Sequence, residues 1–357
     1  MSEILNKPNR TIILITLIIM GVLIIGKFLF DLIVSSDFMI TRAIKRRNAR
    51  NQEVAEDLLS PDQINIVLVG TAGPMSPDVA QQATAVFVNG QFLLFDAGDY
   101  AQKRMEQFNL PMEQLDAVFI THFHNDHIAD LGEVMQRSYI LGREKDLVVY
   151  GPTGVENLVA GFNMVYIGDS HNRTAHHGEE LMPLEYQFAS AREFNADLDE
   201  VVVYEKEGVV VTAFKVAHPP IEPVFGYVIE YRGHKVVISG DTLVTEALAS
   251  HANAADLLVM DVMNYELVSL MGDTFMELGD EELATIMYDI MEYHPDVNDI
   301  AKMIQEEDVQ RVALTHYAPA APVQAMMDKF YVKPIKKVFD GELIAGGDGT
   351  TITIPVN

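Results

Sequence analysis

From residue 51 onward the chain alternates short apolar runs of strand length with longer stretches of helical periodicity. A first strand is predicted at 64–70, and the pattern at 84–95 indicates a hairpin. This hairpin turns at Asn89 and Gly90, a dipeptide that suits a type I′ turn. Further turns are expected at 207–208 and 232–233 in two more hairpins, and at 346–349 in a last strand pair.

Helical periodicity separates these hairpins, and the predicted helices cover residues 130–141, 154–166, 280–292, 296–307 and 322–331. Hairpins and helices therefore alternate in two halves. This order predicts an α/β protein of the α+β type, with two packed sheets and helices outside them. Residues 51–357 are long enough to bury one large core, and no Ser/Gly-rich linker or repeat divides them.

A separate apolar run occupies residues 11–30 and is interrupted by Lys27. A helix of about twenty residues, at roughly 1.5 Å per residue, spans the ~30 Å hydrocarbon layer of a bilayer, and Lys27 can snorkel near one end. A cleaved signal peptide is the alternative, but its apolar region is usually shorter and ends at a small-residue cleavage site. We therefore predict a membrane anchor with one transmembrane helix in residues 1–50, followed by a second domain at 51–357.

Basic residues flank this run on both sides. Lys7 and Arg10 precede it, as in a signal anchor that exports the following domain. The larger cluster follows it and consists of Arg42, Lys45, Arg46, Arg47 and Arg50. By the positive-inside rule this cluster holds the domain in the cytoplasm, or it lies on lipid headgroups. The sequence leaves the side open.

The densest group of chemically active residues follows the apolar stretch 115–121 and reads His122, Phe123, His124, Asn125, Asp126 and His127. On an extended backbone His122 and His124 leave the same face and can grip one ion, whereas Asp126 and His127 follow the start of a turn and can reach a second. The chain has no cysteine, so thiolate ligands are excluded, and imidazole together with carboxylate suits zinc, iron or manganese. A histidine-rich surface loop that binds nothing is the competing interpretation.

Three later strand patterns end in the same way. The runs 209–217, 235–240 and 311–315 lead directly into His218, Asp241 and His316. Enzymes built on sheets assemble their sites from loops at such strand ends. One histidine after a strand is weak evidence, but four such junctions in one chain predict a metal site.

Together, the His-x-His-x-Asp-His run, the Ser-Gly-Asp-Thr segment around Asp241 and the Leu-Thr-His-Tyr segment around His316 closely resemble the metallo-β-lactamase-fold hydrolases. The likeness covers about residues 65–357 and implies an αββα sandwich with two divalent metal ions, most simply zinc. It further implies that His122, His124 and His218 hold one ion, that Asp126, His127 and His316 hold the other, and that Asp241 bridges them. Asp96 matches a position that supports such a site from behind its ligands.

Two branches of this family match the pattern most closely, the arylsulfatase-like enzymes and the ribonuclease Z enzymes that process tRNA 3′ ends. Ribonuclease Z enzymes insert an RNA-gripping arm where this chain has only 22 residues between His218 and Asp241, which read as a plain hairpin. Their His-Glu-Ala segment also looks altered, because residues 258–263 read Leu-Val-Met-Asp-Val-Met. Both departures favour the arylsulfatase-like branch.

The segment 169–178 resembles an insertion of the arylsulfatase-like group in which an arginine and a paired histidine face the substrate. By this resemblance Arg173, His176 and His177 bind the substrate, with the guanidinium on a sulfate or phosphate oxygen. Surface side chains in a solvated loop explain the same residues equally well.

His294 resembles the histidine that, in this branch, donates a proton to the leaving group. A buried or capping histidine is the alternative, and Asp296 on the same turn is better explained as a helix cap than as a catalyst. The resemblance thus implies attack on sulfur or phosphorus by a metal-bridged hydroxide, with Asp126 and His294 as catalytic residues.

Charge bears on the substrate. The net charge is -27, and residues 1–50 carry eight Lys or Arg against three Asp or Glu, which leaves -32 on the remainder. Nucleic-acid binding usually requires a basic footprint, so the charge argues against an RNA substrate.

We therefore expect a membrane-anchored di-metal hydrolase of a small-molecule sulfate or phosphate ester, with homodimerisation left open. The side of the membrane also stays open, with the export of arylsulfatase relatives slightly favouring an extracytoplasmic domain. A ribonuclease Z-like phosphodiesterase acting in tRNA 3′ processing is one alternative. A lipid-directed phosphodiesterase is another, and it predicts an apolar groove near the metals, for which residues 263–276 supply apolar side chains. A metal-binding protein without activity is disfavoured because Asp241 and His294 are both present.

Overall fold

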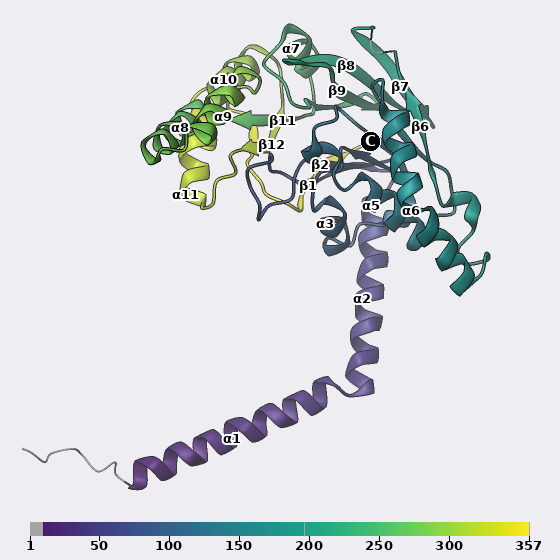
Figure 1. The fold of residues 1–357 in the computed structure, drawn as a ribbon, viewed down its shortest axis with the longest axis vertical. Helices are drawn as coiled ribbons and strands as arrows, with labels where there is room; N and C mark the ends of the chain where they lie inside the picture. Colours follow the sequence, from purple (N-terminus) through teal and green to yellow (C-terminus); the bar gives the residue numbers. More distant parts are fainter. Residues whose placement is uncertain (1–9, 196, 357) are drawn as a thin grey trace, which may run out of the picture. The chain divides into compact units, whose positions relative to one another are not determined.

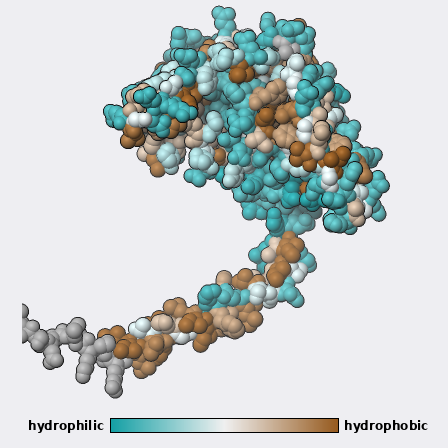
Figure 2. Space-filling model, in the orientation of Figure 1, coloured by the Kyte–Doolittle hydropathy of each residue, from teal (hydrophilic) through white to brown (hydrophobic). Residues whose placement is uncertain are grey.

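The computed structural model describes residues 10–195 and 197–356, which divide into two compact units with the boundary between Val54 and Ala55. The first unit contains α1 (Arg10–Val34) and most of α2 (Asp37–Leu58). Residues Ile12–Val34 form a helix long and apolar enough to cross a membrane, none of which is buried within the protein. Figure 2 shows its hydrophobic side chains facing outward. Ser36 marks the break between the two helices, and its hydroxyl accepts a hydrogen bond from the backbone of Met39.

The second unit is a sandwich of two seven-stranded sheets (Figure 1). Along the first sheet the strands are β14 (Thr350–Pro355), β1 (Gln63–Gly70), β2 (Ala83–Val88), β3 (Gln91–Phe95), β4 (Leu115–Phe119), β5 (Leu147–Gly151) and β6 (Ala189–Glu193). Along the second they are β13 (Glu342–Ile344), β12 (Arg311–Ala318), β11 (Leu257–Met263), β10 (His234–Ile238), β9 (Ile221–Tyr231), β8 (Val209–His218) and β7 (Glu200–Lys206).

Ten helices accompany the two sheets in the described part of this unit. They are α3 (Ala101–Gln107), α4 (Asn125–Ile128), α5 (Leu131–Ile140), α6 (Val155–His177), α7 (Glu246–Ala252), α8 (Tyr265–Leu278), α9 (Glu281–Asp289), α10 (Val297–Glu306), α11 (Gln324–Met327) and α12 (Lys333–Lys336). Helices α3 and α6 contact the first sheet, whereas α7 and α10 contact the second. The predicted α/β sandwich with helices outside two sheets is therefore confirmed.

The three predicted hairpins form where the turn residues place them, and β8 pairs with β9 in a further hairpin that was not predicted. Antiparallel pairing joins β2 to β3, β7 to β8 and β9 to β10. Asn89 and Gly90 both have positive φ, at 48° and 73°, as a type I′ turn requires. Glu207 and Arg232, each followed by a glycine, take the same left-handed conformation in the other two turns.

The prediction of a last strand pair turning at 346–349 is wrong. The two strands exist, but β13 pairs in parallel with β12 and β14 pairs antiparallel with β1, so they lie in different sheets. Asp348 holds the crossover between them, accepting hydrogen bonds from the backbone and hydroxyl of Thr71, from the backbone of Ala80 and from Nε of Arg104.

Most predicted helices are present, with shifted ends. Helix α6 continues eleven residues beyond the predicted end at 166, and the region 322–331 forms α11 and a π-helical turn at Asp328–Val332 instead of one α-helix. Helices α2, α3, α4, α7, α8 and α12 were not predicted. Asp296 caps α10 through the backbone N–H of Asn298, as expected.

Aromatic side chains fill the space between the two sheets. Phe119 on β4 stacks on Phe95 and Tyr150 with ring centroids 4.9 and 5.1 Å away, and it meets Tyr227 of the second sheet at 5.6 Å. Such pairs add about 0.5–1.5 kcal/mol each beyond the burial of their area. This packing fixes β4 against the second sheet, and the histidine-rich loop begins where β4 ends.

We expect Leu93→Ala to lower the free energy of unfolding by about 2–5 kcal/mol, because Leu93 is fully buried between the sheets and the change leaves a cavity. Leu270→Ala is the matched control, since Leu270 lies on α8 with 58% of its surface exposed, and its effect should stay within about 0.5 kcal/mol. Urea denaturation of the full chain in detergent, followed by circular dichroism, measures both. Equal losses would contradict this placement of the core.

Candidate metal centre

The loop that follows β4 carries the first four candidate ligands. Strand β4 ends at Phe119, and the chain turns into the short helix α4, which contains Asp126 and His127. His122, Asp126 and His127 are buried, and His124 is partly exposed. The change from extended backbone to helix separates the two pairs, as the spacing predicted.

The remaining candidate ligands come from three strands of the second sheet. His218 is the last residue of β8, and Asp241 follows β10 by three residues. His316 differs from the expectation of a ligand beyond its strand, because it lies inside β12. There the pairing with β11 skips it, and its φ is 45°. A β-bulge of this kind re-aims one side chain, and here it turns His316 toward Asp126.

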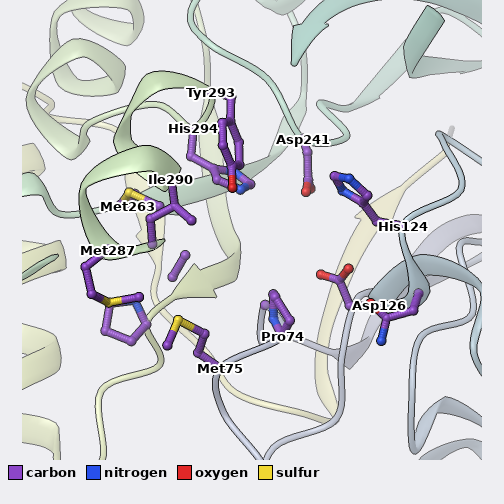
Figure 3. Close-up of a pocket in the computed structure, with 14 residues that line it drawn as sticks. Pro74, Met75, His124, Asp126, Asp241, Met263, Met287, Ile290, Tyr293 and His294 are labelled. Carbon is purple, nitrogen blue, oxygen red and sulfur yellow. The ribbon is translucent and has the colours of Figure 1, made fainter. Parts of the chain in front are cut away.

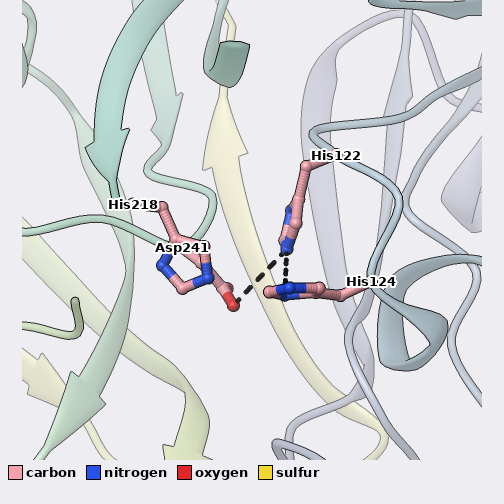
Figure 4. Close-up of side chains that lie close together, drawn as sticks. All are labelled: His122, His124, His218 and Asp241. Atoms are coloured by element: carbon pink, nitrogen blue, oxygen red, sulfur yellow. Dashed lines mark hydrogen bonds and ion pairs between the residues drawn. The ribbon is translucent and has the colours of Figure 1, made fainter. Parts of the chain in front are cut away.

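These seven side chains converge in two clusters of four that share Asp241. In the first cluster, the ligand atoms of His122, His124, His218 and Asp241 lie within 4.8 Å of one another (Figure 4). His122 Nε2 is 2.9 Å from His124 Nδ1 and 4.0 Å from Asp241 Oδ2.

The second cluster contains Asp126, His127, His316 and again Asp241. Oδ2 of Asp241 lies 3.2 Å from His127 Nε2 and 3.3 Å from His316 Nε2. His316 Nε2 is also 3.1 Å from Asp126 Oδ2. The division of ligands implied by the family resemblance and the division found in space are therefore the same.

Side chains and carbonyls behind the clusters fix the histidine rings. Asp96 Oδ2 lies 2.8 Å from His127 Nδ1, so His127 presents Nε2 to the cluster. Asp96 is itself held by the backbone N–H and the hydroxyl of Thr121. His218 Nδ1 lies 2.9 Å from the carbonyl of Tyr293, which leaves Nε2 facing inward. Asp96 thus has the supporting position expected for it.

Burial and neighbouring charge shift the pKa values of these groups. Desolvation lowers the pKa of His122 well below its usual value and also lowers that of His218, so both imidazoles are neutral, the form that binds a cation. Desolvation opposes charge on His127 as well, but Asp241, Asp96 and Asp126 together raise its pKa well above the usual value. The pKa of Asp241 is lowered strongly, against desolvation, by His127 and His316.

The donor set fits a pair of divalent cations. His218 Nε2 and Asp241 Oδ1 are buried and have no hydrogen-bond partner among the described residues. An unpaired buried polar atom costs roughly 1–3 kcal/mol, and these two point into the first cluster. Five imidazoles and two carboxylates with no thiolate are the ligand types that zinc accepts.

His294 lies beside the second cluster and is paired with a residue that the sequence interpretation missed. Its Nδ1 is 3.4 Å from Oδ2 of Asp261, a buried carboxylate on β11, and its ring stacks on His316 with centroids 5.3 Å apart. Burial and the charge of Asp241 raise the pKa of Asp261 to about 8, whereas burial lowers the pKa of His294 to about 4. The signal in the sequence was a single carboxylate within the otherwise apolar run 257–263.

A cavity of about 200 Å³ opens onto the two clusters (Figure 3). His124, Asp126, Asp241 and His294 line one side of it. The opposite side is apolar and includes Met75, Met263, Met287 and Ile290, an arrangement anticipated only under the lipid-directed hypothesis. The candidate centre is therefore accessible to a small group.

Arg173, His176 and His177 do not line this cavity. They lie in the last turns of α6, not in a loop, and Arg173 pairs with Asp169 one turn earlier at 2.7 Å. His176 and His177 are exposed. The helical periodicity of α6 continues through this segment, which explains their placement without a substrate.

Comparison with known proteins identifies the family. The profile of the "Beta-lactamase superfamily domain" matches residues 92–317. A ribonuclease Z of Mycobacterium bovis (strain BCG) is 30% identical over 261 residues, which cover 72% of this chain and 87% of that protein. A ribonuclease Z of Mycobacterium marinum is 29% identical over the same shares.

Solved structures show the same fold. The metallo-β-lactamase fold protein YhfI of Bacillus subtilis matches with a TM-score of 0.59 at 20% identity, over 82% of this chain and all of that one. The short form of human tRNase Z matches with a TM-score of 0.56 at 19% identity, over the same shares. Together with the two ligand clusters, the profile match and the 30% identical relative establish that the chain is a metallo-β-lactamase-fold hydrolase and belongs to the ribonuclease Z branch of that superfamily.

Proposed function

We propose that this protein is a two-metal phosphodiesterase of the ribonuclease Z type and that its substrate is an RNA phosphodiester. The observation that carries the proposal is the pair of four-residue clusters joined by Asp241, in a chain that matches proteins named ribonuclease Z over 87% of their length. The relatives compared above carry the name ribonuclease Z. A ribonuclease Z-like phosphodiesterase is therefore favoured over a hydrolase of sulfate esters.

Each residue has a distinct part in this proposal. His122, His124 and His218 would hold one ion, Asp126, His127 and His316 the other, and Asp241 both. Bound there, the ions supply Lewis-acid activation of a water molecule and of a phosphoryl oxygen. Asp96 holds His127 in the tautomer that presents Nε2. Burial lowers the pKa of His294 to about 4, so we assign it the proton transfer to the departing oxygen on the condition that the negative charge of the bound phosphate raises this pKa, while Asp261 fixes the orientation of its ring.

Asp261 weakens one of the two sequence-based arguments against tRNA processing. The altered His-Glu-Ala segment counted against tRNA processing, yet the segment still supplies a buried carboxylate that contacts His294. The other argument, the missing RNA-gripping arm, still applies, because β9 and β10 form a short hairpin. Any grip on the body of an RNA must therefore come from another part of the chain.

We infer that residues 12–34 anchor the protein in a membrane with its catalytic domain in the cytoplasm. The helix has the required length and apolarity. The earlier inclination toward export relied on the arylsulfatase resemblance. Without it, the five basic residues between Arg42 and Arg50 outweigh Lys7 and Arg10, and the positive-inside rule favours the cytoplasm. An RNA substrate is consistent with that side.

Replacing Asp96 with Asn should weaken zinc binding about 10- to 100-fold, because His127 loses the carboxylate that orients its ring. Competition with a chromophoric chelator measures the affinity of the full chain. Asp116→Asn is the matched control, since Asp116 is a carboxylate paired with Lys145 and Lys206 away from the clusters. Equal zinc affinities of the Asp96 variant and the wild type would show that Asp96 does not support the metal site.

The zinc-loaded protein should cleave a precursor tRNA with a higher kcat/KM than a bis-aryl phosphodiester, and it should leave an aryl sulfate intact. Asp241→Ala should abolish turnover while the circular dichroism spectrum is retained, because both clusters lose their shared ligand. His294→Ala should lower kcat by about 100-fold or more.

His177→Ala is the control for these variants, because His177 is exposed and lies outside the cavity. It should leave kcat/KM unchanged. Selective cleavage of the sulfate ester, with a large loss in the His177 variant, would instead restore the arylsulfatase-like hypothesis. Near-normal activity of Asp241→Ala would refute the two-metal proposal.

The proposed orientation predicts which membrane vesicles protect the domain. Protease added to right-side-out vesicles should leave residues 55–357 intact, whereas inside-out vesicles should lose them. A change of Arg46 and Arg47 to Glu should reduce the fraction of correctly oriented chains, because it weakens the positive cluster. Digestion in right-side-out vesicles would place the domain on the other side.

A further inference from the structure

The apolar side of the cavity, which we call the methionine wall, consists of Met75, Met263, Met287 and Ile290. Regular secondary structure holds three of these residues in place. Met263 ends β11, Met287 lies on α9 and Ile290 begins the 3-10 turn that follows α9. Met263 and Met287 are buried in a hydrophobic cluster with Val268, and Ile290 packs against it. The wall is therefore backed by its own core and holds its shape.

Met75 closes the cavity from another segment. It follows Gly73 and Pro74 in the loop between β1 and β2, and it is 38% exposed. The backbone N–H of Gly73 donates to the carbonyl of Tyr317, the residue after His316. This bond ties the loop, and with it Met75, to the strand that carries one of the candidate ligands.

The chemistry of the lining limits what can bind there. Among the lining residues no Lys, Arg, Ser, Thr or Gln appears. His124, Asp126 and Asp241 lie across the cavity from Met263 and Met287, and Tyr293 and His294 lie near Ile290 (Figure 3). The methionine wall itself offers no positive charge for a second phosphate and no side-chain donor or acceptor. A group packed against Met75, Met263, Met287 and Ile290 is therefore held by apolar contact.

Size and composition favour a flat ring over a long chain. The cavity of about 200 Å³ lies below the roughly 300–1,000 Å³ of sites for drug-sized ligands, so it admits one ring system and not an extended acyl chain. Thioether sulfur makes favourable contacts with aromatic rings, and the ring of Tyr293 lines the same cavity. A nucleobase has an aromatic face of this kind.

We propose that Met75, Met263, Met287 and Ile290 form a subsite for one nucleobase next to the phosphate that is cleaved, held by its faces without readout of its edges. This rests on the proposed phosphodiesterase function and names the part of an RNA substrate that the cavity accepts. Because no side chain of the wall pairs with base edges, purines and pyrimidines are accepted alike.

Binding of small phosphate esters to the zinc-loaded full chain tests the subsite without requiring turnover. Isothermal titration calorimetry compares ribose 5-phosphate, which has no base, with uridine and adenosine 5′-monophosphates. The two nucleotides should bind about tenfold more tightly than ribose 5-phosphate, in line with base stacking energies, and should differ from each other by less than about threefold. Butyl phosphate serves as the hydrocarbon probe and should bind more weakly than either nucleotide.

Two substitutions locate the effect on the wall. Met75→Gln and Met287→Gln should each reduce the advantage of the nucleotides to about threefold or less, while ribose 5-phosphate binds as in the wild type. Met75 is at the cavity mouth, so its variant tests the wall even if Met287→Gln is poorly folded. Met276→Gln, a partly exposed methionine of α8 outside the cavity, is the matched control and should change nothing.

Several results would overturn the subsite. Equal binding of nucleotides and ribose 5-phosphate, or no binding of any of them, would exclude it, and tighter binding of butyl phosphate would assign the wall to hydrocarbon. A base advantage without cleavage of precursor tRNA would leave the subsite standing and refute the proposed function. Cleavage of precursor tRNA without tighter binding of the nucleotides would support the proposed function and exclude the subsite.

Discussion

The site is organised around one buried carboxylate, Asp241, which is shared by two groups of side chains. Histidines within 4.0 Å of it come from both sheets, and one of its oxygens has no hydrogen-bond partner among the described residues. Burying unpaired polar atoms and charge this closely is costly unless cations compensate. The arrangement is therefore best explained as a metal centre, and the rest of the fold serves to bring Asp241 and its neighbours together.

Irregular backbone conformations position several of these side chains. Asp96 and His316 both have positive φ, at 58° and 45°, and His316 occupies a bulge in an otherwise regular parallel pairing. Gly98 allows the chain to pass close to the ligand loop, since a Cβ there would lie 2.1 Å from the carbonyl oxygen of Asp126. Such strained positions are stable only where the surrounding core determines them. The aromatic packing of Phe119 between the sheets provides that support at the start of the loop.

The two sides of the cavity have different chemical roles. The ligand side contains the residues that the family resemblance implies, and it would treat any tetrahedral oxyanion alike. The methionine wall belongs to α9, β11 and the loop after β1, outside the ligand motifs, and it is where this chain can distinguish one ester from another. The acidic domain and the short β9–β10 hairpin leave the body of an RNA without an evident grip, so this local contact carries much of the proposed specificity.

The sequence by itself determined the candidate ligands and the three predicted hairpins, whereas the division of the ligands into two groups and the αββα architecture came from the family resemblance. It could do so because ligand spacing, strand-end position and turn chemistry are local properties. Tertiary structure alone decided the rest. Strands β13 and β14 diverge into different sheets because their partners, β12 and β1, are distant in the chain. Asp261 meets His294 and the methionine wall faces the ligands only after separate elements have packed, whereas Arg173, His176 and His177 are carried away from the cavity by an uninterrupted helix.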